Sequence, residues 1–304
     1  MALDEVFVAT CLATGMALEP VPPKPGCVSR VRDFEDKKLS DFVTCSHLAV
    51  YPLTKAVRDG LEGVPRVGAR IREVVELCIL ATGRNVCLGT AMLLAPIATG
   101  IGLAARAGKR VGVRELLSIA RSAVYSCGVD DSIELYRAVR LAAPSYVRPS
   151  DRVEAPNVWS PRFEEELREG GWTLGRVLEE ASSRDIVARE IVEGFPRVAR
   201  AVEIIEGFED ACEGCRKAFI ELLASNVDTV VSRKVGEDFA KYVSYLAKRV
   251  LEGAESEDTL DRVLLEKRVS PGSIADIVAA ALSLALLKRV CRALQDRIKL
   301  CILS

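Results

Sequence analysis

The stretch from residue 86 to 105, VCLGTAMLLAPIATGIGLAA, constrains the fold more than any other, because it carries no charge over its twenty positions. Twenty apolar residues in a helix are long enough to cross a bilayer. The alternative is a helix buried on all sides in a large helical bundle. No second stretch is equally apolar, since residues 273–287 include Asp276. The sequence therefore favours a buried central helix and no membrane partner.

The hydrophobic periodicity of the rest of the chain is helical. Apolar residues recur at i, i+3, i+4 and i+7 in four further stretches, 66–82, 131–142, 211–224 and 236–252. No alternating run of strand length is followed by a hairpin turn. The pattern is interrupted at 20–26, 60–65, 144–161 and 268–272, and none of these has the composition of a flexible linker. We predict an all-α fold in which residues 1–304 form a single domain around the apolar helix.

The charge balance limits the partners of the protein. The 304 residues include 42 basic and 43 acidic side chains, with 49% hydrophobic residues. A chain without net positive charge has no general attraction to nucleic acid or to an anionic membrane surface. We expect no nucleic-acid partner, and the sequence does not define the oligomeric state.

The amide and cysteine contents suggest where the protein works. Asparagine and glutamine are almost absent, as in proteins selected against heat-labile side chains, so we expect a thermophilic source. Asp4 and Glu5 stand where a signal peptide would carry basic residues, which favours the cytoplasm. Thiols there are usually reduced, although hyperthermophiles are an exception, so disulfides among the ten cysteines stay open.

A single histidine, His47, excludes sites that need several imidazoles. It lies in an apolar helical segment, and we interpret it as a core or rim residue. Cys212 and Cys215 form one CxxC pair without a second pair or a histidine at ligand spacing. Ordinary helical thiols, a redox or disulfide pair and a structural zinc site all remain possible for this pair.

Charged turns at the ends of apolar segments are the strongest functional signal. Residues 21–33, VPPKPGCVSRVRD, combine a rigid proline-rich loop with several charges, and we expect Lys24 to be exposed there and to meet a phosphate. The N-terminal ends of helices attract anions through their backbone N–H groups. We therefore predict that all such turns gather on one side of the molecule. The other four are ATGRNVCLG (81–89), SSRDIVAREIVEGFP (182–196), NVDTVVSRKVG (226–236) and RVSPGSIADIVAA (268–280).

In this order, the five motifs resemble the triphosphoribosyl-dephospho-CoA synthase family. Its members show PKPG, an ATGG-type turn, a GFP after an arginine–glutamate helix, a DT followed by arginine and glycine, and SPGGSAD. The resemblance spans residues 17–285. The sequence differs from the family pattern at Phe34–Leu39 and at Asn85–Gly89, and it is similar to a divergent subgroup.

The resemblance implies an all-α enzyme that takes ATP and 3′-dephospho-CoA, expels adenine, and joins the triphosphoribosyl unit to the ribose 2′-oxygen. The product in that family is the precursor of the prosthetic group of the acyl carrier proteins of citrate lyase and malonate decarboxylase. Two alternatives remain: a related ATP-dependent glycosyl or phosphoryl transferase with another acceptor, and a non-catalytic nucleotide-binding protein. If the protein is an enzyme, at least two of the aspartates in or next to these turns should face one cavity.

The residue types suit this chemistry. A triphosphate needs cations and usually Mg²⁺, which prefers carboxylates, and an acid is required to accept the 2′-hydroxyl proton. We predict a nucleotide site with Mg²⁺ held by Asp36, Asp228 and Asp276, the same three acting in catalysis with Glu190. The predicted nucleotide-binding residues are Lys24, Gly26, Arg30, Arg32, Asn85, Gly89, Arg189, Arg233, Lys234, Ser270 and Gly272.

Overall fold

The computed structural model describes residues 4–144 and 154–293, and within them the chain is all helical, as predicted. The helices are α1 (Glu5–Leu18), α2 (Leu39–Glu62), α3 (Val67–Thr82), α4 (Leu88–Arg106), α5 (Val113–Ser126), α6 (Val129–Ala142), α7 (Phe163–Glu169), α8 (Leu174–Ser182), α9 (Ile186–Val192), α10 (Pro196–Glu206), α11 (Ala211–Ser225), α12 (Thr229–Val235), α13 (Glu237–Leu251), α14 (Glu257–Glu266) and α15 (Gly272–Ala293).

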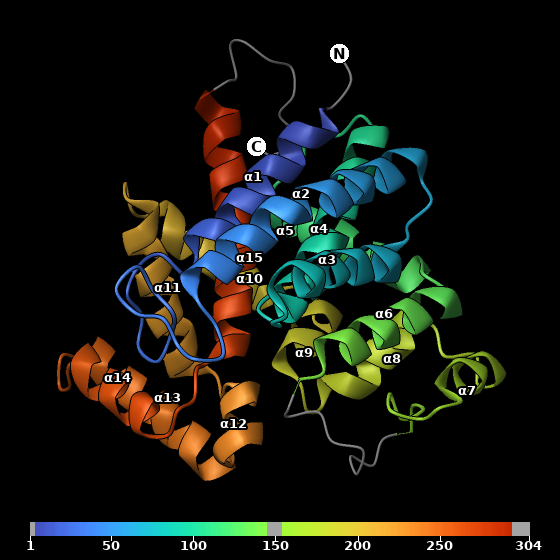
Figure 1. The fold of residues 1–304 in the computed structure, drawn as a ribbon. Helices are drawn as coiled ribbons and strands as arrows, with labels where there is room; N and C mark the ends of the chain where they lie inside the picture. The colour runs from blue at the N-terminus through green and yellow to red at the C-terminus, as the bar shows by residue number, and fades with distance from the viewer. Residues whose placement is uncertain (1–3, 145–153, 294–304) are drawn as a thin grey trace.

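The apolar stretch forms α4, and α4 is a core helix. It packs against α2, α3, α5 and α15, and 78% of its most apolar window is buried inside the structure (Figure 1). Among the described residues it is the one helix long and apolar enough to cross a membrane, but its apolar surface is covered by other helices. The prediction of a buried central helix is confirmed.

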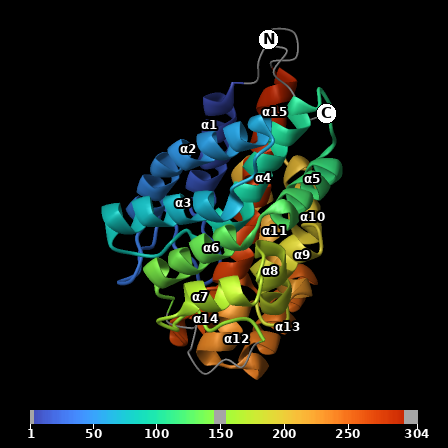
Figure 2. The same cartoon turned by 90° about the vertical axis from the view of Figure 1, so that its right-hand side faces the viewer.

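The second long central helix is α15. It runs through the molecule between α1 and the pair α10 and α11, and it also contacts α4 (Figure 2). The buried side chains form one cluster to which helices from α1 to α15 contribute. A single domain over the whole chain stays a prediction.

Glycines explain how closely α2 and α4 approach. A Cβ at Gly60 would lie 2.1 Å from the Thr99 carbonyl oxygen, and one at Gly102 would lie 2.0 Å from the Val57 carbonyl oxygen. No larger residue fits without separating the helices, since real Cβ contacts do not fall below about 3 Å. Gly60 of α2 and Gly102 of α4 therefore serve helix packing.

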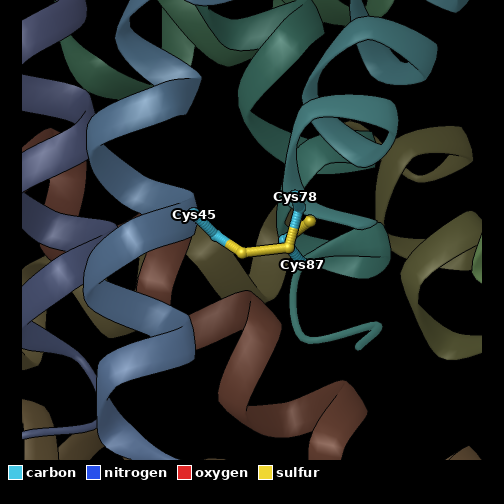
Figure 3. Close-up of side chains that lie close together, drawn as sticks. All are labelled: Cys45, Cys78 and Cys87. Carbon is cyan, nitrogen blue, oxygen red and sulfur yellow. A yellow bond between two sulfur atoms is a disulfide. The ribbon is translucent and has the colours of Figure 1, made fainter. Parts of the chain in front are cut away.

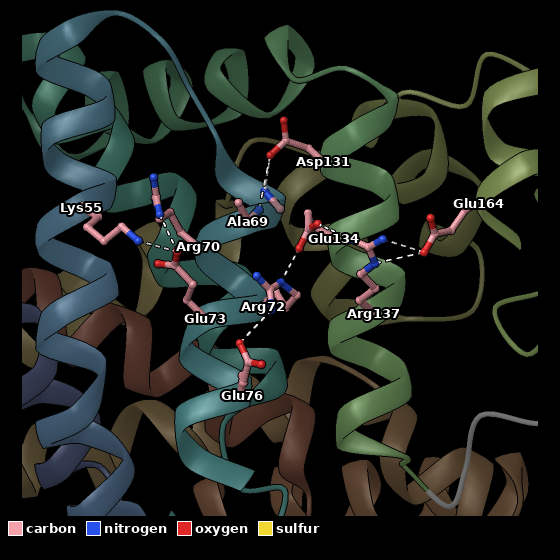
Figure 4. A network of polar contacts seen from close by, with 11 residues as sticks. Lys55, Ala69, Arg70, Arg72, Glu73, Glu76, Asp131, Glu134, Arg137 and Glu164 are labelled. Carbon is pink, nitrogen blue, oxygen red and sulfur yellow. Dashed lines mark hydrogen bonds and ion pairs between the residues drawn. The ribbon is translucent and has the colours of Figure 1, made fainter. Parts of the chain in front are cut away.

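Ion pairs tie α2, α3, α6 and α7 together on one face (Figure 4). Lys55 of α2 contacts Glu73 of α3 at 2.5 Å, and Arg72 of α3 pairs with Glu134 of α6. Arg137 extends this network to Glu164 of α7 at 2.7 Å. Linked pairs of this kind lose less side-chain entropy per contact than isolated ones.

Candidate functional site

Two adjoining cavities lie where α4, α12 and α15 meet. The polar cavity, of about 160 Å³, is lined by Asp36, Lys37, Lys234 and Ser270 among others. The apolar cavity, of about 190 Å³, is lined mainly by side chains of α6, α8 and α9 and by residues 155–158. Both are bordered by Leu88, Gly89, Val230 and Asp276, so they meet at these four residues.

All five predicted turns contribute to these cavities. The lining residues from them include Cys27, Asn85, Asp185, Lys234 and Ser270, one from each turn. The prediction that the turns gather on one side is therefore confirmed. Two turn aspartates border each cavity, Asp36 with Asp276 in the polar one and Asp185 with Asp276 in the apolar one.

Asp276 lies at the junction of the cavities on the first turns of α15. Its Oδ1 accepts a hydrogen bond from the Thr90 hydroxyl at 2.5 Å. A Cβ at Gly89 would lie 2.1 Å from its Oδ2, so only glycine leaves room for this carboxylate. Burial raises the pKa of Asp276 to about 7 against the Thr90 hydrogen bond, and the negative charges of Glu19 and Asp228 add to the rise. A carboxylate with this pKa can hold or release a proton near neutral pH.

The polar cavity carries two lysines at its outer end. Lys37 donates to the Ser270 hydroxyl at 2.8 Å, next to the start of α15. Burial and the charge of Lys37 lower the pKa of Lys234, while Asp36 opposes this effect. Two neighbouring ammonium groups of this kind can attract an anion such as a phosphate. The same lysines border a further hollow toward solvent with Phe34 and Arg268.

Lys37 was missed at the sequence level, as were Glu19, Thr90, Tyr136 and Arg184 in the cavity walls. Lys37 belongs to the segment 34–39 that replaces a family motif, and this substitution by charged residues was the available signal. Thr90 and Tyr136 lie within helices, and Glu19 lies at the end of α1, so no motif marked them. Arg184 lies in the turn 182–196 but was not selected from it. Only the three-dimensional convergence identifies them.

Seven predicted residues line the polar cavity, namely Asp36, Asn85, Gly89, Lys234, Ser270, Gly272 and Asp276. The side chain of Asn85 also accepts a hydrogen bond from the Leu88 N–H at 3.2 Å, at the beginning of α4. Arg233 lines the apolar cavity and donates to the Arg184 carbonyl at 3.3 Å.

Asp228 lies outside both cavities. It is 1% exposed, and its two oxygens accept hydrogen bonds from the N–H groups of Val231 and Ile274, both at 2.9 Å. One carboxylate thus caps both α12 and α15. Burial raises its pKa to about 6 against these hydrogen bonds. Both oxygens are engaged in helix caps away from the two cavities, which opposes the roles of Mg²⁺ ligand and catalytic acid predicted for Asp228.

We expect Asp228→Asn to lower the free energy of unfolding by about 2 kcal/mol, because the amide NH₂ faces a backbone donor that needs an acceptor. Thermal and urea unfolding measure this loss. ATP affinity of the folded variant should change equally little with and without Mg²⁺. A selective loss in Mg²⁺ would restore Asp228 as a ligand.

Lys24 is 3% exposed, so the expectation of an exposed loop lysine is wrong. Its amine lies 3.2 Å from Oε1 of Glu19 and also donates to the Glu19 and Pro22 carbonyls. Burial is the largest single influence and acts to lower the pKa of Lys24, but the charge and hydrogen bond of Glu19 together with Cys215 and Cys27 outweigh it, so the net shift of the pKa is upward and the amine stays charged. Lys24 borders neither cavity and reaches the site only through Glu19, which lines the polar one.

Three more predicted residues, Gly26, Arg30 and Arg32, lie in the N-terminal loop. Arg32 forms a bidentate ion pair with Asp261 of α14 at 2.7 and 2.8 Å, and the same carboxylate accepts from the Gly26 N–H at 2.8 Å. Arg30 is exposed. None of the three borders the two cavities, so the structure gives them no place at the predicted nucleotide site.

Arg189 and Glu190 also lie away from the cavities. Arg189 donates to the Ser182 and Ser183 carbonyls at the end of α8, at 2.8 and 3.1 Å. Glu190 is fully buried, accepts from the Val198 N–H at 2.7 Å, and pairs with Arg197. Their contacts are those of residues that hold helix ends together, which opposes the catalytic role predicted for Glu190.

The remaining sequence features lie outside the site. His47 is exposed on α2, where Nδ1 is 2.8 Å from the Val43 carbonyl. Cys212 and Cys215 are free thiols. A disulfide instead joins Cys45 and Cys78.

The all-α fold carries two adjoining cavities, with lysines at one end and a single acid, Asp276, at the junction, an arrangement that suits a transferase. A family model for ATP:dephospho-CoA triphosphoribosyl transferases (CitG) matches residues 6–293, and the chain belongs to this family. It is a triphosphoribosyl-dephospho-CoA synthase-like transferase.

Solved structures agree on the fold. A crystal structure of a candidate triphosphoribosyl-dephospho-CoA synthase from Archaeoglobus fulgidus is 22% identical, with a TM-score of 0.60. The match covers 78% of this chain and 97% of that one. No curated protein matches the sequence.

Proposed function

We propose that the protein transfers the triphosphoribosyl unit of ATP to the ribose 2′-oxygen of 3′-dephospho-CoA and releases adenine across the junction of the two cavities. The observation that carries this proposal is the position of Asp276, which borders both cavities. A transfer between two large substrates needs their reacting atoms to meet at one point. The junction is such a point, and one carboxylate faces it.

The polar cavity suits the triphosphate. Lys37 and Lys234 supply positive charge, and α15, a helix of 22 residues, begins beside them at Gly272. Backbone N–H groups at a helix start add to the attraction of lysine for phosphate oxygens. The apolar cavity, with Tyr136 and Val158 in its wall, suits the acceptor.

The polar cavity also fits Mg²⁺ in donor chemistry. Asp36 and Asp276 offer hard carboxylate oxygens there, and Mg²⁺ on a nucleotide usually takes one or two carboxylates together with phosphate oxygens and water. We assign the cation to Asp36 and the phosphates, where it would neutralise the triphosphate. Asp276 is then left for the proton.

In the transfer, the acceptor 2′-oxygen attacks C1′ of the ATP ribose, the bond from C1′ to adenine breaks, and Asp276 accepts the proton of the 2′-hydroxyl. Adenine leaves with the bonding electron pair and takes up a proton, so that no net proton is gained or lost. Thr90 holds the carboxylate in place by its hydrogen bond. Lys37 and Lys234 hold the triphosphate and so fix the ribose to which it is attached.

Release of adenine tests the proposal. The protein is incubated with Mg²⁺-ATP, with and without 3′-dephospho-CoA, and the products are separated by chromatography and mass spectrometry. Adenine formed in equal amount with triphosphoribosyl-dephospho-CoA supports the transfer. Formation of ADP or AMP without adenine would mean phosphoryl transfer or hydrolysis instead.

A related transferase with another acceptor is the second candidate. The sequence departs from the family pattern at Asn85–Gly89, and Leu88 and Gly89 of this segment border both cavities. A different acceptor is supported if adenine appears only when another hydroxyl compound replaces 3′-dephospho-CoA.

We expect Lys37→Ala to weaken ATP binding about tenfold, because it removes one charge-assisted hydrogen bond to phosphate. Calorimetry in Mg²⁺ measures this affinity. Lys217→Ala, on α11 and outside both cavities, serves as the matched control and should bind ATP like the wild type. Equal affinity of both variants would remove Lys37 from the site.

We infer in addition a heat-adapted protein that works in the cytoplasm. The ion-pair network of α2, α3, α6 and α7 is of the type that gains importance at high temperature. Seven of the cysteines whose surroundings the structure describes are free thiols, in keeping with a reducing compartment. Activity and unfolding measured against temperature test the first of these inferences.

A further inference from the structure

Three cysteines converge beside the candidate site without a part in the proposed transfer (Figure 3). Cys45 belongs to α2, Cys78 to α3, and Cys87 directly precedes α4. Each is at most 2% exposed, and their sulfur atoms all lie within 4.8 Å of one another. Cys45 and Cys78 form a disulfide with a Cα–Cα distance of 4.8 Å, while Cys87 is a thiol.

We propose that the protein with this disulfide reduced binds one thiophilic divalent cation, of the zinc class, through Cys45, Cys78 and Cys87. Zinc–sulfur bonds of about 2.3 Å place the sulfurs around one ion about 4 Å apart. The Cys87 sulfur already lies within 4.8 Å of the other two, while the sulfurs of Cys45 and Cys78 are bonded to each other and have to move apart to this spacing once the disulfide opens. The disulfide and the cation use the same two sulfurs and exclude each other.

The donor chemistry separates this site from the nucleotide site. Thiolates select zinc or monovalent copper, whereas Mg²⁺ prefers carboxylate, phosphate and water oxygens. Cys87 also lines the polar cavity, which leaves the fourth position of a tetrahedral ion open to a water molecule on that side. Three ligands from three separate segments hold the ion from different directions.

Loading of the site begins with a two-electron reduction. A dithiol reductant gives two electrons and two protons to the sulfurs of Cys45 and Cys78 and becomes a disulfide itself. The cation then displaces the protons of the three thiols, so that three metal–sulfur bonds form and three protons are released. Cys87 is two residues before Gly89, so a bound ion would fix the start of α4 beside the junction of the cavities.

Cobalt, as a spectroscopic substitute for zinc, tests the site in the full-length protein. The protein is reduced, freed of reductant without oxygen, and titrated with Co²⁺. We expect one Co²⁺ per chain, with sulfur-to-cobalt charge-transfer absorption and d–d bands of tetrahedral type. Protein with the disulfide intact should show neither. Equal binding by oxidised protein, or no thiolate band after reduction, would overturn the proposal.

Variants identify the ligands. Cys45→Ser and Cys87→Ser should each weaken Co²⁺ binding about a hundredfold or more, since each removes one thiolate. The double variant C212S/C215S is the control, because it removes the CxxC pair and should bind like the wild type. Circular dichroism establishes that each variant is folded. Binding that survives Cys87→Ser and Cys45→Ser but disappears in the control would place the ion at the CxxC pair and contradict the proposal.

Discussion

Asp276→Asn is expected to lower the rate of adenine release by about 10²- to 10⁴-fold while ATP affinity changes little. Asparagine has nearly the shape of aspartate and can still accept the Thr90 hydrogen bond, but it cannot take up the proton of the attacking hydroxyl. Steady-state kinetics and calorimetry on the same variant separate the two quantities. Asp33→Asn is the matched control, because this exposed carboxylate caps α2 outside both cavities.

The pH dependence gives a second measure of the same group. A base must be ionised, so kcat/KM of the wild type should fall about tenfold per pH unit below the pKa of Asp276, which is about 7. The residual activity of Asp276→Asn should lack this limb. A variant that keeps both the limb and most of its rate would show that another group accepts the proton.

The raised pKa of Asp276 also determines how the stability of the protein depends on pH. The pKa of Asp276 in the folded protein lies above its ordinary value, so the folded state binds this proton more tightly than the unfolded state. The stability contributed by the proton is complete below the ordinary pKa of aspartate and is lost as the pH rises through about 7. Above pH 7, Asp276→Asn should thus be at least as stable as the wild type, and its loss of activity is not a folding defect.

Helical periodicity and motif order were sufficient to predict the fold class and the meeting of the turns. Helices at 66–82 and 211–224 appear as Val67–Thr82 and Ala211–Ser225, because a repeat of about 3.6 residues has one structural interpretation when no strand pattern competes. The turns meet because each ends or begins a helix that packs against α4 or α15. The positions of the helices can therefore be predicted from the hydrophobic periodicity alone.

The role of each charge within a turn could not be predicted in the same way. Asp228 and Asp276 are both aspartates close to a helix start, yet one caps two helices with both its oxygens and the other borders two cavities. The difference depends on Ile274 N–H, 46 residues away from Asp228, and on the space left by Gly89. Contacts between distant residues decide which charge is buried in the framework and which meets a ligand.

Burial by neighbouring residues also changes what we expect of Lys24 in the proline-rich loop. Lys24 forms a buried ion pair with Glu19, and Lys24→Ala would leave this carboxylate, itself 5% exposed, without its partner. We expect the free energy of unfolding to fall by about 3–5 kcal/mol, as for other buried pairs that lose one member. An exposed lysine would contribute about 0–1 kcal/mol.

Urea unfolding of Lys24→Ala measures this loss, and Arg30→Ala is the control from the same loop, because Arg30 is exposed and should contribute less than about 0.5 kcal/mol. The double variant K24M/E19Q should recover much of the loss, since it removes both charges and keeps the volume of the side chains. The result also decides between the two interpretations of the loop. If Lys24 meets phosphate, ATP affinity falls and stability is unchanged; if it neutralises Glu19, as its burial indicates, stability falls and the folded variant retains most of its ATP affinity.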